Sequence, residues 1–332
     1  MTYSGSDSKR RGEFALITEL FAPLASAPGA FGLTDDAAIA TPPAGYDLVI
    51  TTDALVEGVH FFASDPPELI GQKVLRVNLS DLAAKGCAPV GYLLALSIPE
   101  RFGMEWLRGF ASGLARDQRE FGISLYGGDT TATPGPLTIA LTAFGHVPAG
   151  AMLRRAGAAP GDLVFVSGTI GGAGGELACR KGEGRSLTAD QREELVRRFH
   201  LPEPRIELGR ALIGLASASI DISDGLLADL GHIAETSNVR IEIDSTRVPL
   251  SPALVALWPD EANRIVRAAT AGDDYELAFT APAEKSVAVL HAARRVGVRI
   301  AEIGAVSRGR GVALHDSARN PIPVSHPGYV HF

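Results

Sequence analysis

The sequence predicts an α/β or α+β protein built from two domains. Segments with strand-like and helix-like patterns alternate along the whole chain, which is typical of these fold classes. The 332 residues are enough to build two hydrophobic cores. A run of turn-forming residues at 147–150 (VPAG) interrupts the alternation. We therefore expect a first domain over 12–148 and a second over 149–332.

The first domain is expected to contain four strands and two helices. β-forming residues predict the first strand, and strict alternation of apolar residues with Thr and Ala predicts the last. Pro99 follows the second strand and separates it from the second helix. The expected strands are 46–51, 91–98, 123–126 and 137–144, and the expected helices are 70–85 and 104–121.

The second domain is expected to mix short buried strands with helices. A glycine-rich loop at 168–175 follows its first strand, and a polar stretch at 181–192 predicts an exposed loop or the start of a helix. The expected strands are 162–167, 219–222, 239–243 and 276–280, and the expected helices are 224–235, 252–269 and 283–296.

Composition limits the partners that this chain can have. Hydrophobic residues make up 46% and charged residues 21%, which indicates a folded globular protein. The net charge of −7 argues against nucleic acid or an anionic membrane as a partner. No apolar run reaches the length of a membrane span. The polar residues 1–11 lack the apolar core of a signal peptide and predict a disordered tail.

Two isolated cysteines, Cys87 and Cys179, offer neither a CxxC spacing nor a disulfide framework. This usage fits a reducing compartment, so a cytoplasmic protein is expected. Both thiols are interpreted as small buried apolar side chains; a catalytic role is the alternative.

Aspartates recur where strands or helices are expected to end. Each could be an ordinary turn or helix-capping residue, because a short carboxylate accepts backbone N–H bonds. Together they indicate a site for a hard cation such as Mg²⁺, to which Thr51 and Thr52 would add hydroxyl oxygens. No histidine or cysteine spacing indicates zinc. The aspartates are Asp35, Asp36, Asp53, Asp81, Asp129, Asp221, Asp224, Asp273 and Asp274.

Asp81 is the aspartate that a turn explains least well. At 3.6 residues per turn it shares a helix face with Asn78 and Lys85, beside a stripe of leucines. A carboxylate beside a buried stripe is costly unless it is paired or binds a metal. Metal coordination and an ion pair with Lys85 are both open.

Phosphate binding is predicted without a P-loop, because the sequence has no GxxxxGK[ST] motif and only five lysines. The amides of loop 168–175 could face an anion, or its glycines could serve close packing. Arg154 and Arg155 are either solvated charges or phosphate contacts. His60 is either structural or functional. A site rich in aspartate and without an obvious nucleophile suits phosphoryl transfer.

Several ordered segments resemble the thiamine-monophosphate kinase family, within the wider aminoimidazole ribonucleotide synthetase-like group of ATP-dependent proteins. The most specific are TTDALVEGVHF (51–61), VNLSDLAAKGCAP (77–89) and DISDGLLADLGHIAE (221–235). The others are GEFALI (12–17), DDAAI (35–39), GGDTT (127–131), RRAGAAPGDLVFVSGTIG (154–171), GDDYELAFT (272–280) and GYVHF (328–332).

The resemblance implies a two-domain fold of that group and a homodimer in which the N-terminal sheets pair. It also implies transfer of the γ-phosphoryl group of ATP to thiamine monophosphate, giving thiamine diphosphate. Mg²⁺ is the implied cofactor, and K⁺ is a further candidate.

By motif position, the resemblance also implies roles for single residues. Asp53, Asp81 and Asp129 are the expected catalytic residues. The metal positions are Asp36, Thr51, Thr52, Asp53, Asp81, Asp129, Asp221 and Asp224. Nucleotide contacts are Gly128, Asp129, Arg155 and Ser223. The thiamine phosphate is expected at His60, Asp273 and Tyr329.

Three positions depart from the family pattern. Thr34 replaces a glycine in the turn before Asp35, which predicts a different local backbone. Asp273 stands where the family has a longer glutamate that meets the substrate. Gly172 stands where many members carry an acidic residue. None of these removes an expected metal ligand.

Two other hypotheses follow from the same residues. The first keeps the fold and the use of ATP but changes the acceptor. The second is a protein that binds nucleotide or thiamine phosphate without catalysis.

Overall fold

The computed structural model describes residues 13–184 and 186–329, so the tail expected at 1–11 lies outside the described residues. The chain forms two compact units. The first comprises the chain up to Asn78 together with Pro89–His146, and the second comprises Leu79–Ala88 together with the chain from Val147 onward. The last turns of one helix therefore belong to the second unit.

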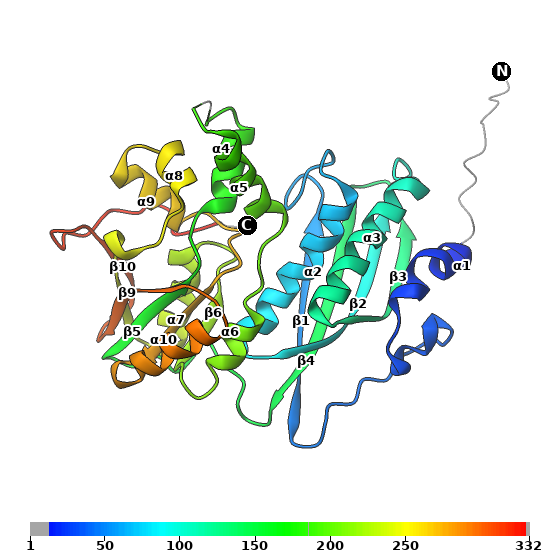
Figure 1. The fold of residues 1–332 in the computed structure, drawn as a ribbon, viewed down its shortest axis with the longest axis horizontal. Helices are drawn as coiled ribbons and strands as arrows, with labels where there is room; N and C mark the ends of the chain where they lie inside the picture. The colour runs from blue at the N-terminus through cyan, green and yellow to red at the C-terminus, as the bar shows by residue number, and fades with distance from the viewer. Residues whose placement is uncertain (1–12, 185, 330–332) are drawn as a thin grey trace. The chain divides into compact units, whose positions relative to one another are not determined.

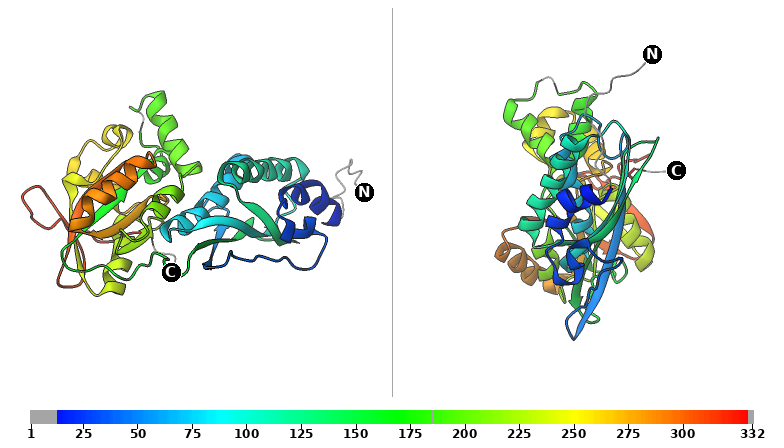
Figure 2. Two further views of the ribbon diagram at one scale, coloured as in Figure 1. Left: turned by 60° about the horizontal axis from the view of Figure 1, so that its bottom comes forward. Right: turned by 90° about the vertical axis from the view of Figure 1, so that its right-hand side faces the viewer.

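The first unit is built on a four-stranded sheet ordered β1-β4-β2-β3 (Figure 1). β2 and β3 are parallel, and Ala95 lies opposite Asp129. Two long helices lie on one side of this sheet, as the right-hand view of Figure 2 also shows. Its elements are β1 (Tyr46–Val56), α2 (Pro67–Ala84), β2 (Ala88–Ile98), α3 (Met104–Phe121), β3 (Ser124–Ala132) and β4 (Thr138–Pro148).

Burial explains why the sheet has one helix-covered side. Leu107, Phe110 and Leu114 recur at helical spacing on α3 and are buried. On β1, the exposed Leu48 and Ile50 alternate with the buried Val49. From residue 13 onward, four short helices precede β1: α1 (Glu13–Leu16), η1 (Ile17–Phe21), η2 (Ala22–Leu24) and η3 (Pro28–Leu33).

The second unit is built on a six-stranded sheet ordered β10-β7-β9-β5-β8-β6. Its neighbouring strands are antiparallel except for the parallel pair of β10 and β7. The strands are β5 (Asp162–Ser167), β6 (Ala218–Asp221), β7 (Arg240–Asp244), β8 (Leu277–Pro282), β9 (Ile300–Ser307) and β10 (Gly311–His315).

Helices complete two apolar clusters in this unit. Leu226, Leu230 and Ile233 of α7 (Leu226–Ser237) pack with the strands in the larger cluster. Leu195, Leu254 and Trp258 belong to the smaller one. In the left-hand view of Figure 2, α10 (Ser286–Arg295, orange) lies across the sheet. The others are α4 (Gly172–Arg180), α5 (Ala189–His200), α6 (Ile206–Ala211), η4 (Ser245–Arg247), α8 (Pro252–Leu257), α9 (Glu261–Ala269) and η5 (Ala283–Lys285).

The predicted helix at 104–121 and the predicted strand at 162–167 are confirmed at both ends. Two strand ends were predicted wrongly: β1 continues through Thr51, Thr52 and Asp53, and β3 continues through Asp129. Both continuations are rich in Thr or Val, which favour strands, so backbone pairing extends past the expected stop. β9 and β10 were not predicted, and the helix expected at 252–269 is two helices separated around Pro259.

Among the described residues, no helix combines the length and apolar character needed to cross a membrane.

Candidate active site

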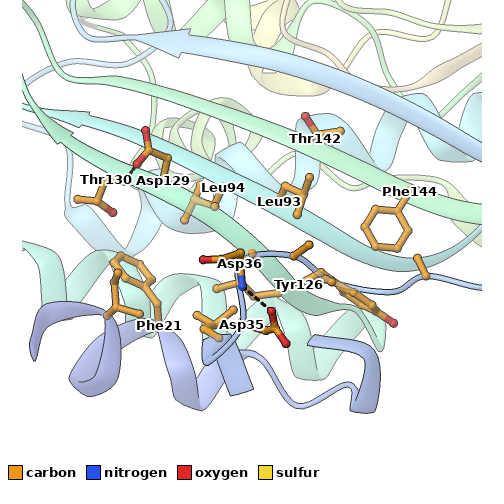
Figure 3. A pocket seen from close by; sticks show the side chains of 18 of the residues that line it. Phe21, Asp35, Asp36, Leu93, Leu94, Tyr126, Asp129, Thr130, Thr142 and Phe144 are labelled. Atoms are coloured by element: carbon orange, nitrogen blue, oxygen red, sulfur yellow. Dashed lines mark hydrogen bonds between the residues drawn. The ribbon is translucent and has the colours of Figure 1, made fainter. Parts of the chain in front are cut away.

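A cavity of about 750 Å³ lies in the first unit, on the open side of its sheet (Figure 3). Asp35 and Asp36 reach it from the loop after η3, and Asp129 and Thr130 reach it from β3. These two segments are more than ninety residues apart in sequence. Apolar side chains that include Leu93, Tyr126 and Phe144 line the rest, so the cavity has an acidic part and an apolar part.

The residue before Asp129 on β3 has to be a glycine. A Cβ atom at Gly128 would run into the backbone of Leu94 on β2, so only glycine fits where the two strands approach. Asp129 is exposed, and its Oδ1 accepts the N–H of Thr130 at 2.9 Å. Asp36 is exposed as well, and its N–H donates to Asp35 Oδ1 at 2.8 Å. The structure thus brings together Asp36, Gly128 and Asp129.

β1 divides the Thr-Thr-Asp triplet between its two faces. Side chains alternate along a strand, so Thr52 lies on the same face as Leu48 and Ile50, which line the cavity. Thr52 accepts a hydrogen bond of 3.1 Å from Thr142, another lining residue. Thr51 and Asp53 lie on the opposite face and are half-buried. Of the three residues, only Thr52 therefore lies on the cavity face of β1.

His60 lies in a tight turn after β1. Its Nδ1 accepts the N–H of Val56 at 3.0 Å, and its carbonyl oxygen accepts the buried Lys73 ammonium at 3.1 Å. Both contacts fix the ring and the backbone of His60 within the first unit.

In the second unit, the carboxylate of Asp81 lies close enough to Asp221 to repel its charge. Asp221 is buried, and Ser80 donates to its Oδ2 at 2.8 Å. Burial raises the pKa of Asp221 well above its ordinary value, and the charge of Asp81 raises it further. Lys85 donates to the carbonyl of Ser219 at 3.2 Å, and burial lowers its pKa while Asp221 and Asp81 oppose that shift. The predicted proximity of Lys85 to Asp81 is thus one part of a larger charged cluster.

The turn between β6 and α7 carries Ser223 and Asp224. The Oδ2 atom of Asp229 accepts three backbone N–H bonds from this turn, at 3.0 to 3.1 Å, from Ser223, Asp224 and Gly225. Burial, followed by the charge of Asp224, raises the pKa of Asp229 to about 7. Ligand atoms of Asp224, Asp229 and His232 lie within 4.8 Å of one another. Asp229 therefore shapes the loop that holds two predicted site residues.

The same turn holds two expected substrate residues. The N–H of Asp273 donates to the carbonyl of Ser223 at 2.8 Å, and the N–H of Tyr329 donates to the carbonyl of Asp224 at 2.9 Å. Ser223, Asp224, Asp273 and Tyr329 are thus brought together within one unit. Arg155 is exposed in this unit and acts electrostatically on Lys85.

The glycine-rich loop is not an open anion site. The buried Asp274 carboxylate accepts the N–H of Gly171 at 2.7 Å and that of Gly172 at 3.1 Å, at the start of α4. A Cβ atom at Gly171 would collide with Ala268. The close-packing interpretation of these glycines is confirmed, and the anion interpretation is wrong at these two amides because a protein carboxylate occupies them. Gly172, which stands where many family members carry an acidic residue, is one of the two residues whose N–H groups Asp274 binds.

Glu276, the residue directly before β8, anchors the same loop through two arginines. It is fully buried and accepts Arg198 Nη1 at 2.9 Å and Arg205 Nε at 2.7 Å. Arg198 also donates to the carbonyl of Thr169 at 2.7 Å. This buried ion-pair network ties the strand after Asp273 to loop 168–172.

Two further expectations concern single positions. Thr34 has an ordinary negative φ of −101°, while Phe31, Gly32 and Leu33 take the left-handed conformations of this turn. The backbone thus accommodates the threonine. Cys87 is buried as predicted, whereas Cys179 is only partly buried, and neither forms a disulfide.

The donor set fits a hard divalent cation. The Asp81 charge lies close enough to Asp221 to oppose the ionisation of that buried carboxyl, and a cation would relieve the repulsion. Asn78 Oδ1, one turn before Asp81 on α2, is buried and has no hydrogen-bond partner among the described residues. Oxygen donors of this kind are the ligands that Mg²⁺ prefers.

Two models of known families cover most of the chain. Residues 34–147 match the N-terminal domain of AIR synthase related proteins, and residues 159–317 match the C-terminal domain. The fold and the acidic site thus define a two-domain protein of the AIR synthase related class.

Similarity to individual proteins narrows this class. The chain is 42% identical to a thiamine-monophosphate kinase of Caulobacter vibrioides, over 96% of this chain and 90% of the relative. It is 38% identical to that of Escherichia coli, over 97% of this chain and 98% of the relative. The chain belongs to the thiamine-monophosphate kinase family.

Solved structures agree with this assignment. A thiamine-monophosphate kinase from Stenotrophomonas maltophilia K279a superposes with a TM-score of 0.79 at 41% identity, covering 85% of this chain and 89% of the other. AaThiL complexed with AMPPCP and TMP superposes with a TM-score of 0.77 at 33% identity, covering 92% and 97%.

Sequence reasoning missed two residues that support the site, Asp229 and Glu276. It also counted Asp274 among the candidate cation ligands, whereas the structure has this carboxylate accepting two backbone N–H groups. A signal for Asp229 was present, because it interrupts the apolar face of its helix just as Asp81 does. Asp274 and Glu276 follow Asp273 at alternating positions before an apolar strand, but nothing in the sequence indicates which partners they bind.

Proposed function

We propose that this chain transfers the γ-phosphoryl group of ATP directly to the phosphate of thiamine monophosphate, giving thiamine diphosphate and ADP. The observation that carries the proposal is the similarity to thiamine-monophosphate kinases over nearly the full length of both chains. A complex of one such relative with AMPPCP and TMP supports the choice of both substrates.

In this proposal the acidic side chains hold Mg²⁺. Asp36, Thr52 and Asp129 would hold it in the first unit, and Asp81, Asp221 and Asp224 in the second. Thr51 and Asp53 lie on the other face of β1 from the cavity, so we assign them to metal ions bound on that side. Bound Mg²⁺ would supply charge neutralisation between two anionic substrates and polarise the γ-phosphate. K⁺ is a further candidate cofactor.

The protein's own residues bind and orient the two substrates. We assign nucleotide contacts to Gly128, Asp129, Arg155 and Ser223, and contacts with thiamine monophosphate to His60, Asp273 and Tyr329. Asp53, Asp81 and Asp129 act in catalysis by holding Mg²⁺ near the γ-phosphoryl group that is transferred. No strong general base is required, because the acceptor phosphate is already ionised near neutral pH. Positioning of the reacting groups then accounts for most of the catalysis.

The proposed working state is a cytoplasmic homodimer in which the sheets of the first unit pair. Its support is an exposed apolar patch on the open side of that sheet, made of Leu48, Ile50 and Leu93. Ile50 is 62% exposed and its neighbours Leu48 and Leu93 are 40% and 42% exposed, which is unusual for large apolar side chains that line one face of a monomer. Neither nucleic acid nor a membrane is expected as a partner.

A comparison of acceptors tests the proposal. Purified protein with ATP and Mg²⁺ is expected to consume ATP with thiamine monophosphate and to form thiamine diphosphate. Turnover with an amide or selenide acceptor and not with thiamine monophosphate would instead support a related enzyme with a different acceptor. Mg²⁺-dependent binding of both substrates without release of ADP would indicate a binding protein.

A further inference from the structure

The segment 272–276 presents alternate side chains to two different surroundings. Asp274 and Glu276 are buried, at 2% and 0% exposure, and hold the glycine loop. Asp273 and Tyr275 between them are half-buried. Asp274 and Glu276 anchor the segment, and this anchoring fixes the backbone position of Asp273 and Tyr275.

The backbone of this second pair is strained. Asp273 has a φ of 66° and Tyr275 a φ of 51°, in the left-handed region that residues other than glycine rarely adopt. Such residues cost on the order of 1–3 kcal/mol each and persist where the surroundings enforce them. Enforcement here comes from two backbone bonds of 2.8 Å, from the Asp273 N–H to Ser223 O and from the Tyr275 N–H to Ile222 O.

This conformation brings the two side chains together. The Tyr275 hydroxyl donates to Asp273 Oδ1 at 3.1 Å. A hydrogen bond to an ionised carboxylate is stronger than one between neutral groups. A carboxylate has about four acceptor sites, so one bond from a rigid phenol fixes its orientation and keeps its capacity to accept others.

We propose that Tyr275 is a positioning residue for the substrate: it holds the Asp273 carboxylate in the orientation that binds the thiamine portion of thiamine monophosphate. The inference rests on the proposed function. Thiamine carries a cationic thiazolium ring and an amino group, and a fixed carboxylate complements such groups. Because these groups lie away from the bonds that change, a misplaced carboxylate weakens substrate binding more than it slows transfer.

The test is the Tyr275→Phe variant, which removes the hydroxyl and keeps the ring. We expect the KM for thiamine monophosphate to rise roughly 5- to 20-fold, in line with the loss of part of a hydrogen bond to a charged group. The kcat and the KM for ATP should stay within about twofold of wild type, which a general loss of structure would not allow. Tyr46→Phe, on an exposed tyrosine of the first unit, is the matched control.

A double-mutant cycle identifies the partner of the hydroxyl. In an Asp273→Ala background, Tyr275→Phe is expected to have no further effect on the KM for thiamine monophosphate. Additive effects would overturn the inference, as would an unchanged KM in the single variant. A parallel rise in the KM for ATP, together with a lower thermal midpoint, would also overturn it. Failure of the wild-type protein to form thiamine diphosphate would instead refute the proposed function.

Discussion

At the scale of single residues, this protein arranges carboxylates in two ways. Exposed ones such as Asp36 and Asp129 line a cavity, where water or cations can reach them. Buried ones such as Asp229 and Asp274 bind backbone amides and hold loops in place. The distinction decides which substitution affects catalysis and which affects folding.

Asp53→Asn is expected to fold normally and to lose nearly all turnover. The amide has the same shape as the carboxylate but lacks the charge needed to hold Mg²⁺. Steady-state kinetics and thermal unfolding on the same preparation check this, with Asp47→Asn on the same strand as the control. Full activity of Asp53→Asn would exclude a metal-binding role.

Cys87 is expected to resist thiol reagents in the native state. Burial raises the pKa of its thiol to about 12, so almost no thiolate is present at pH 8. Mass spectrometry after brief alkylation should find Cys87 unmodified in native protein and modified after unfolding in guanidinium chloride. Equal labelling rates in the two states would show that the thiol is accessible and ionised.

At the scale of elements, sequence patterns predicted most helices and strands but not where β1 and β3 end. Hydrophobic periodicity marks the buried core of a strand, whereas its end depends on pairing with neighbours that are distant in sequence. β9 and β10 were missed because their residues, such as Ala301, Glu302 and Gly304, do not alternate clearly; their pairing with β5 and β7 decides their structure. The motifs identified Asp36 and Asp129 as metal positions, and the structure adds that both line one cavity. The anchoring roles of Asp274 and Glu276 emerged only from the tertiary contacts.

The start of α4 provides a prediction at this scale. Asp274→Asn should destabilise the protein by about 1–3 kcal/mol, because the carboxamide has a single oxygen and one of the two buried backbone amides loses its acceptor. Urea unfolding measures this. Glu207→Gln, which breaks an exposed ion pair on α6, is the control and should change stability little.

The same substitution should change how stability depends on pH. Burial raises the pKa of Asp274 to about 7, above its value in the unfolded chain. Protons therefore bind the folded state more tightly, and stability from this group rises as the pH falls from about 7 to about 4. The advantage of wild type over Asp274→Asn should be larger at pH 5 than at pH 8. An advantage that is larger at pH 8 would contradict this assignment.

At the scale of the whole molecule, the predicted metal positions are distributed over both units: Asp36, Thr51, Thr52, Asp53 and Asp129 belong to the first, and Asp81, Asp221 and Asp224 to the second. Folding of each unit arranges its own set. We propose that each set holds Mg²⁺ within its own unit, because phosphoryl transfer between two anionic substrates requires charge neutralisation.

Pairing of the first units gives a prediction about assembly. Ile50→Asp places a charge in the exposed apolar patch and should convert a dimer into a monomer. Light scattering after size-exclusion chromatography measures the mass directly. A dimeric Ile50→Asp variant, or a monomeric wild type, would contradict pairing through this face.

The most direct test of the account is the formation of products with and without metal. Protein incubated with ATP, Mg²⁺ and thiamine monophosphate is predicted to form ADP and thiamine diphosphate in equal amounts, and EDTA is predicted to abolish both. Release of ADP without thiamine diphosphate, or formation of thiamine diphosphate that EDTA leaves unchanged, would contradict it.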